Sequence, residues 1–148
     1  MPAPAGASPA EVGNKAWHLM RLADAGLPVP PGFVLETGWG SGFASDDERR
    51  QRLRELLGHE VRALEGVAGR TFGGGRRPLL LAVRSGAPVS MPGMMDTVLD
   101  VGLGAALLAP MRRDTGNPRL FWDSYRRLVE GVGSTVLGVP PGRFVQAM

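Results

Sequence analysis

Apolar residues recur with a helical period in three stretches of the chain. Residues 14–25 carry apolar side chains three and four positions apart, which predicts a first helix. A leucine-rich stripe predicts a second helix that runs to about Gly66. Ser45 is expected to cap it, because a glutamate three residues later completes a capping box. A third helix is expected to open at Asn117 or Pro118.

Two other stretches have the pattern of strands. Five consecutive apolar residues, Leu79 to Val83, predict a strand buried on both faces. Residues 27–35 contain three prolines before a short apolar run, which predicts an extended segment entering a short edge strand. The apolar, glycine-punctuated segment after Thr97 fits either a short strand and turn or a short helix. The order of elements predicts an α+β (α/β) fold in which helices flank a small mixed sheet.

Composition narrows the class of protein. The chain has 148 residues, enough for one domain with a moderate core, and 43% of them are hydrophobic. There is no cysteine, which excludes disulfides and thiolate metal sites and leads us to expect a cytoplasmic location. No apolar run reaches the length of a membrane span, so no membrane partner is expected. Residues 1–12 are rich in Ala, Pro and Gly, and we expect a disordered tail there.

The basic charge does not indicate a nucleic-acid partner. The formal net charge is +3, and the 17 basic residues comprise sixteen arginines and a single lysine. The arginines are interleaved with acids, as in DDERRQRLRELLGHE. Nucleic-acid-binding proteins concentrate positive charge on one face, so this pattern favours solvated helix faces instead.

Candidate chemistry begins where the predicted central strand ends. Arg84 follows the strand directly and opens a loop that contains Pro88, Pro92 and Gly93. A strand fixes an arginine in place and such a loop brings backbone N–H groups near an anion, so this stretch predicts a phosphate site. Lys15 lies in the first turn of the first helix, where it fits two interpretations equally: a phosphate ligand or a surface residue.

The loop residues themselves leave alternatives open. Met91, Met94 and Met95 could pack in a core or form an adaptable cover over a ligand. Asp96 and Thr97 could cap a following turn or helix as readily as serve a metal. No metal site is expected, because the acids make no adequate pair and the two histidines lie apart in helices.

Four stretches resemble the pyruvate, phosphate dikinases, in the same order as in that family. They are GNKAWHLMRLADAGLPVPPGFVL, GRTFGGGRRPLLLAVRSGA, VSMPGMMDTVLDVGL and PRLFWDSYRRLVEGVGSTVLGV. Together they cover most of residues 13–139. The methionine-rich loop is the specific one, because the related phosphoenolpyruvate synthases have a different loop. The resemblance is to the N-terminal nucleotide-binding domain of the family.

This resemblance implies a fold and a division of the chain. The fold would be the N-terminal part of an ATP-grasp domain with the start of a helical insert subdomain. Residues 13–108 would belong to the ATP-grasp part and residues 117–148 to the insert. The full enzyme converts ATP, phosphate and pyruvate to AMP, pyrophosphate and phosphoenolpyruvate.

The resemblance also implies ligands and partners. Lys15 and Arg84 match the cations that contact the ATP phosphates. The matching lid over those phosphates comprises Ser90, Met91, Gly93, Met94, Met95, Asp96 and Thr97. Mg²⁺ would accompany ATP, with its ligands outside this chain, and the full enzyme would be a homo-oligomer. The phosphocarrier histidine and the pyruvate site belong to the remainder of the dikinase, so no catalytic residue is expected here. The alternative is a non-catalytic module that binds a nucleotide or a partner.

Overall fold

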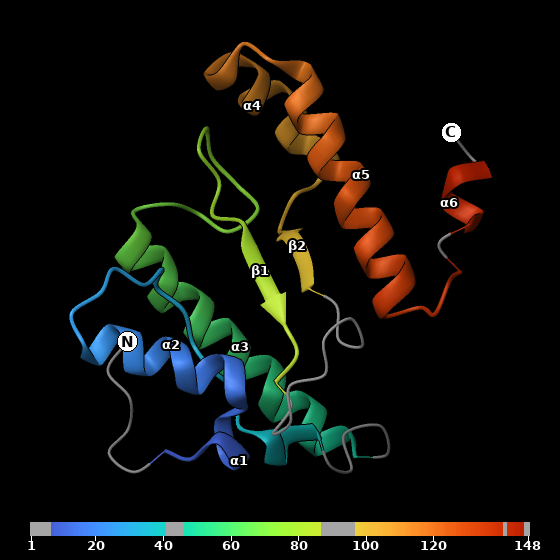
Figure 1. The fold of residues 1–148 in the computed structure, drawn as a ribbon. Helices are drawn as coiled ribbons and strands as arrows, with labels where there is room; N and C mark the ends of the chain where they lie inside the picture. Colours follow the sequence, from blue (N-terminus) through green and yellow to red (C-terminus); the bar gives the residue numbers. More distant parts are fainter. Residues whose placement is uncertain (1–6, 41–45, 87–96, 141, 147–148) are drawn as a thin grey trace. The chain divides into compact units, whose positions relative to one another are not determined.

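The computed structural model describes residues 7–40, 46–86, 97–140 and 142–146, which form two compact units (Figure 1). The first unit comprises the described residues up to Ala68 together with Gly86; the second comprises residues 69–85 and those from Thr97 onward. The first contains α1 (Pro9–Val12), α2 (Asn14–Asp24), the 3₁₀-helix η1 (Thr37–Gly40) and α3 (Asp47–Ala68). The second contains β1 (Leu81–Arg84), β2 (Thr97–Val101), the 3₁₀-helix η2 (Ala105–Leu107), α4 (Leu108–Thr115), α5 (Pro118–Thr135) and α6 (Gly142–Gln146). Helices with a small sheet confirm the α+β class.

Local capping starts the first two helices. The Glu11 carboxylate accepts hydrogen bonds from the Ser8 backbone N–H at 2.9 Å and from the Ser8 hydroxyl at 2.8 Å, which closes a capping box around α1. α1 therefore forms within the segment assigned from composition to the tail. Gly13, at φ 79°, then turns the chain into α2, which begins at Asn14 as predicted. α1 also packs against η1, where the Thr37 hydroxyl donates to the Ala10 carbonyl at 2.9 Å.

The second predicted helix is α3, and it begins one residue later than expected. Its cap is Asp46, whose carboxylate accepts the Arg49 backbone N–H at 2.9 Å. The predicted cap, Ser45, lies outside the described residues. Ion pairs join Arg50 to Asp47 and Arg52 to Glu48 along the helix, which agrees with a solvated charged face.

The predicted edge strand after the first helix is wrong. Residues 27–36 contain no strand. Proline lacks the N–H that a ladder needs, and the described sheet consists of β1 and β2 alone.

The sheet of the second unit has two antiparallel strands rather than the predicted mixed arrangement. Leu81 pairs with Val101, Val83 with Val98 and Arg84 with Thr97. The predicted strand at residues 79–83 begins two residues later than expected. It is also not buried on both faces, since its last three residues are exposed. The physical reason is that the helix that packs on this sheet, α5, contacts it mainly through β2.

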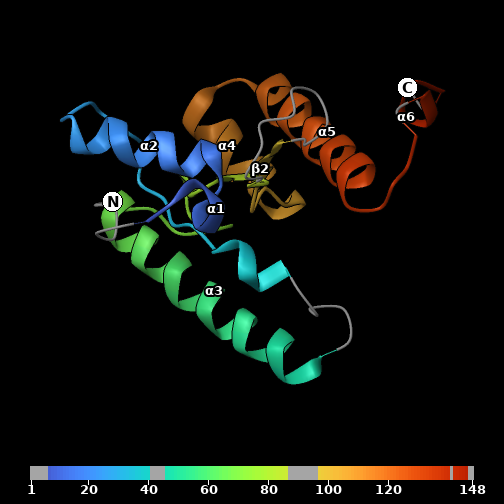
Figure 2. The same cartoon turned by 60° about the horizontal axis from the view of Figure 1, so that its bottom comes forward.

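Helix α5 packs on the sheet of the second unit and contributes to its core. α5 runs alongside β2, with Gly131 next to Val98 (Figures 1 and 2). The segment after Thr97, for which the sequence fitted either a strand or a helix, contains one of each. It begins as β2 and continues through η2 into α4. Leu103, Leu107 and Phe121 form the core, and Phe121 is 1% exposed. The third predicted helix is confirmed as α5, capped by the Asn117 side chain.

Candidate functional site

The antiparallel sheet places the predicted phosphate-binding arginine opposite a second predicted site residue. Arg84 is the last residue of β1, Thr97 is the first residue of β2, and the two form the terminal pair of the ladder. The predicted phosphate loop therefore leaves and re-enters the sheet at one fixed pair. Thr97 opens a strand, so the alternative that it caps a turn or helix is wrong.

Arg84 lies at the end of the strand with its side chain exposed. The residue is exposed, and within the described residues its guanidinium has no ion-pair partner. A planar guanidinium offers five N–H donors in a fixed fork that matches two oxygens of a phosphate. This position can therefore bind an anion.

Ser85 adds a group that the sequence interpretation did not select. Its hydroxyl oxygen is buried and has no hydrogen-bond partner among the described residues. Most buried polar groups in folded proteins are paired, so an unpaired one next to a candidate ligand-binding arginine needs an explanation. The sequence signal was a small hydroxyl residue between a strand-ending arginine and Gly86.

Lys15 lies in the first unit, at the second position of α2. It is exposed, and the first turn of α2 contains no acidic residue to compensate its charge. Gly13 precedes the helix without a side-chain cap. Within the same unit, a Cβ at Gly86 would come within 3.3 Å of the Val12 carbonyl oxygen. Gly86 therefore lies close to the backbone of the turn that precedes Lys15.

The remaining predicted site residues are Ser90, Met91, Gly93, Met94, Met95 and Asp96, and they lie outside the described residues. The two histidines, His18 in α2 and His59 in α3, belong to the first unit, whereas Arg84 belongs to the second. His18 packs edge-on against Trp17 at 5.0 Å between ring centroids, and the Nδ1 of His59 lies 3.1 Å from Glu60. Among the described residues no group of three or more His, Asp or Glu side chains could hold a metal ion, and no helix could cross a membrane.

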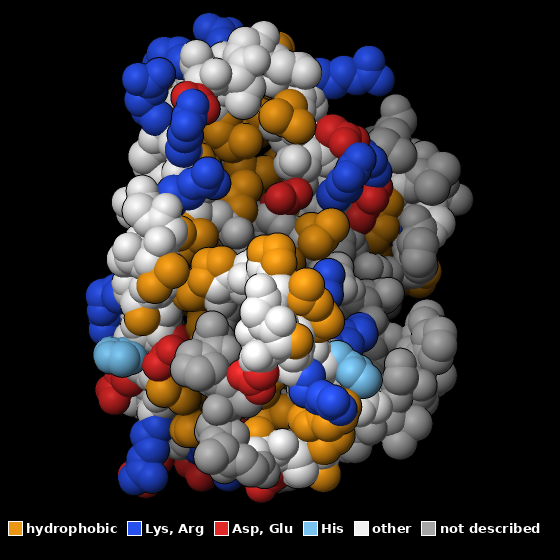
Figure 3. All heavy atoms as spheres, turned by 60° about the vertical axis from the view of Figure 1, so that its left-hand side comes forward, with side chains coloured by type: hydrophobic (Ala, Val, Ile, Leu, Met, Phe, Trp, Pro, Cys, Tyr) orange, Lys and Arg blue, Asp and Glu red, His pale blue; other side chains and the backbone are white. Residues whose placement is uncertain are grey.

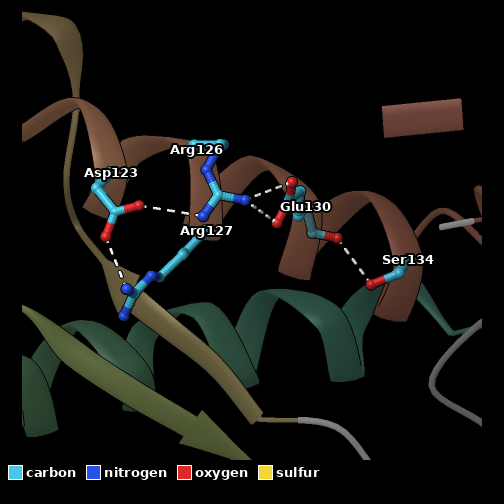
Figure 4. A network of polar contacts seen from close by, with 5 residues as sticks. All are labelled: Asp123, Arg126, Arg127, Glu130 and Ser134. Atoms are coloured by element: carbon cyan, nitrogen blue, oxygen red, sulfur yellow. Dashed lines mark hydrogen bonds and ion pairs between the residues drawn. The ribbon is translucent and has the colours of Figure 1, made fainter. Parts of the chain in front are cut away.

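A second charged group lies along α5, and Figure 4 shows its contacts. Arg126 bridges Asp123, at 3.1 Å, and Glu130, at 2.7 Å, while Arg127 binds the other Asp123 oxygen at 2.7 Å. The hydrogen bond from Arg126 is the main reason that the pKa of Asp123 is below its ordinary value. The same bonds raise the pKa of Arg126. Because these charges compensate one another along one helix, they explain local helix stability.

Similarity to known proteins extends over most of the chain. It is 42% identical over 129 residues to the pyruvate, phosphate dikinase of Rhizobium meliloti, which spans 86% of this chain and 14% of that protein. It is 37% identical over 134 residues to the enzyme of Clostridium symbiosum, and 40% identical over 133 residues to pyruvate, phosphate dikinase 2 of Oryza sativa; each match covers 90% of this chain and 15% of the relative. This chain is homologous to part of the pyruvate, phosphate dikinases.

The similarity covers only a small part of each dikinase. No protein-family model matches the chain. The chain spans about one seventh of the length of the dikinases to which it is similar. The relationship confirms the resemblance noted from the four sequence stretches and supports a kinase-type family.

Proposed function

We propose that this chain provides the ATP-phosphate contacts of a pyruvate, phosphate dikinase, as the N-terminal part of an ATP-grasp nucleotide-binding domain. Arg84 and Lys15 bind phosphate oxygens, and the loop from Ser90 to Thr97 covers them. The observation that carries the proposal is the pairing of Arg84 with Thr97, which joins the two strand ends between which the predicted phosphate loop runs. Within the described residues the Arg84 guanidinium has no ion-pair partner.

The chemistry of the described groups suits a phosphate. Phosphoryl transfer depends mainly on positioning and on cations and N–H donors that stabilise phosphate charge. Arg84 supplies a cation, and the neighbouring Ser85 hydroxyl is buried without a hydrogen-bond partner among the described residues. Mg²⁺ would neutralise phosphate charge when bound; we place its ligands outside this chain.

This chain provides only part of the sites that a complete dikinase needs. Residues 13–108 contribute to the nucleotide-binding part, and residues 117–148 begin the helical insert. The phosphocarrier histidine and the pyruvate site lie on the remainder of a homo-oligomeric enzyme. Residues 1–148 alone are therefore expected to form no phosphoenolpyruvate from ATP, phosphate and pyruvate; its appearance with pure protein would contradict this division.

ATP binding tests the proposal directly. We expect Arg84→Ala and Lys15→Ala each to weaken ATP binding by roughly tenfold or more in calorimetric titrations, because each removes a charge-assisted hydrogen bond. Arg143→Ala in the second unit and Arg62→Ala in the first remove one positive charge elsewhere and serve as matched controls. If the site variants bind ATP as the controls do, the phosphate-binding role is wrong.

The alternative function, a non-catalytic partner-binding module, has one observation in its favour. Apolar side chains are exposed on α5 and β1, including Trp122 at 54% and Val83 at 52%. Exposed apolar patches of this kind mark interaction surfaces. This alternative predicts unchanged ATP affinity in both site variants, so the same titration distinguishes the two functions.

A further inference from the structure

A second concentration of arginines lies at the opposite end of β1 from Arg84. The loop that leads into β1 and the last turn of α4 line an open, shallow hollow of about 410 Å³. Its lining comprises Gly69, Arg70, Thr71, Gly75, Arg76, Arg77 and Asp114. Figure 3 shows basic side chains, which in the second unit are all arginines, gathered over the end that carries α4. We call this hollow the arginine pocket.

The charges of the arginine pocket are not balanced. Its one carboxylate, Asp114, is 20% exposed and accepts from the Arg77 Nε at 3.1 Å, while an Arg76 nitrogen lies 3.8 Å away. No ion pair involving Arg70 occurs within the described residues. Arg112 and Arg113, in the last turn of α4, add further positive charge nearby. The residues that line the pocket therefore carry more positive than negative charge.

This arrangement differs from the arginines of a solvated helix face. On α3, Arg50 and Arg52 each have an acidic partner one turn away on the same helix. In the arginine pocket the cations come from a loop, and the one acid comes from a helix 37 residues further along the chain. Convergence of unlike segments on one hollow is the feature of a binding site.

The framework of the pocket is fixed by packing and backbone hydrogen bonds. The Leu79 N–H donates to the Thr71 carbonyl at 2.8 Å and closes the base of the loop. Phe72 lies so close to Gly102 that a Cβ there would come within 2.7 Å of the ring. The loop that carries Arg70, Arg76 and Arg77 is therefore fixed before an anion binds. This reduces the conformational entropy that binding would cost.

We propose that the arginine pocket binds a small multiply charged phosphate anion. Guanidinium groups match phosphate oxygens in pairs, and a hollow of this size admits a diphosphate group. Asp114 holds Arg77 in position, while Arg70 and Arg76 supply the principal contacts. A hollow favours a compact anion over the flat acidic surface of a protein. This proposal does not rest on the nucleotide role of Arg84.

The test uses inorganic pyrophosphate as the probe and follows each arginine separately. In the complete chain labelled with ¹⁵N-arginine and carrying Arg84→Ala, pyrophosphate should shift the Nε–Hε signals of Arg70, Arg76 and Arg77 with one common saturation curve. The signal of Arg143, on α6, should stay in place. Signals that all move together without saturation would show diffuse charge attraction and overturn the proposal.

Variants provide the second arm. Arg70→Gln combined with Arg76→Gln keeps the Arg77–Asp114 pair and should weaken pyrophosphate binding by about tenfold or more. Arg143→Gln should change it less than about twofold, because it removes a charge outside the hollow. Equal affinities in these two proteins overturn the proposal. So does a hexaglutamate peptide that competes at lower concentration than inorganic phosphate, which would assign the pocket to an acidic protein partner.

Discussion

The two ends of β1 carry arginines under opposite conditions. Before the strand, Arg77 is held by Asp114, and its loop is supported by Phe72 packed at Gly102. After the strand, Arg84 has a single ladder partner, Thr97, and the neighbouring Ser85 hydroxyl is buried and unpaired within the described residues. One end is stabilised by contacts with other parts of the same unit, whereas at the other end the described residues leave the Ser85 hydroxyl without a hydrogen bond and the Arg84 guanidinium without an ion pair.

This difference leads to separate expectations for stability and for ligand binding at the two ends. A buried hydroxyl without a partner costs roughly 1–3 kcal/mol of desolvation, and a folded protein retains such a group where a ligand or a function uses it. The contacts of Phe72 and Asp114 support the fold at the first end, which we call the held end. At the second end, which we call the open end, we propose that ATP supplies the missing hydrogen-bond partners. Changes at the held end should therefore lower stability, whereas changes at the open end should weaken ATP binding without lowering stability.

The largest expected effect is at the held end. Gly102→Ala should destabilise the protein by about 2–3 kcal/mol, because φ is 104° and the new Cβ would meet the Phe72 ring at 2.7 Å. Urea unfolding followed by circular dichroism measures the change. The control is Gly104→Ala, at φ −129° with nothing within 4 Å of the new Cβ, which should cost less than about 0.5 kcal/mol. Equal costs would show that Phe72 does not anchor the loop.

At the open end, Ser85→Ala should raise stability and weaken ATP binding together. Removing an unpaired buried hydroxyl relieves a desolvation cost, so we expect a gain of about 1 kcal/mol in the free energy of unfolding. ATP affinity should fall a few-fold, because the nucleotide loses a donor.

Ser134→Ala is the matched control for this substitution. The Ser134 hydroxyl donates to the Glu130 carbonyl at 2.7 Å, so its removal should leave stability unchanged or lower it by about 0.5–1 kcal/mol, with ATP affinity unchanged. If both serine variants lose stability, the Ser85 hydroxyl has a partner in solution, and the contrast between the two ends of β1 fails.

Features set by local interactions were predictable from the sequence. The starts of the helices at Asn14 and Pro118 follow from apolar spacing and, for Pro118, from the Asn117 cap, each of which depends on a few neighbouring residues. Arg84 at the end of a strand was predicted on the same local basis. By contrast, apolar propensity at residues 33–35 predicted a strand that has no partner with which to pair.

Features set by contacts between distant residues were not predictable. The pairing of Arg84 with Thr97 depends on the register across a long loop, and the sequence alone placed Thr97 within that loop. The arginine pocket depends on Asp114 meeting Arg77 across 37 positions, with Phe72 at Gly102 as the support. Neither spacing nor composition contains that information.

A smaller effect compares the two arginines directly. Arg77→Gln should lower stability by about 0.5 kcal/mol, since it breaks an exposed ion pair with Asp114, and the loss should shrink as salt is added. Arg84→Gln should leave stability unchanged at any salt concentration, because no ion pair of the described residues is lost. Thermal unfolding at low and high salt measures both. A salt-dependent loss in Arg84→Gln would mean that the open end is also internally compensated.

The smallest effect concerns α5, outside both ends of β1. The Arg126 hydrogen bond holds the pKa of Asp123 below its ordinary value, so this carboxyl should titrate below a normal aspartate in a ¹³C-detected pH titration. A lowered folded-state pKa stabilises the fold above the unfolded pKa, near 3.9, and the contribution disappears as pH falls through the folded value. Arg126→Gln should raise the pKa of Asp123 while leaving ATP binding as it was. A loss of ATP affinity in this variant would extend the binding region beyond the Arg84 end of the sheet and onto α5.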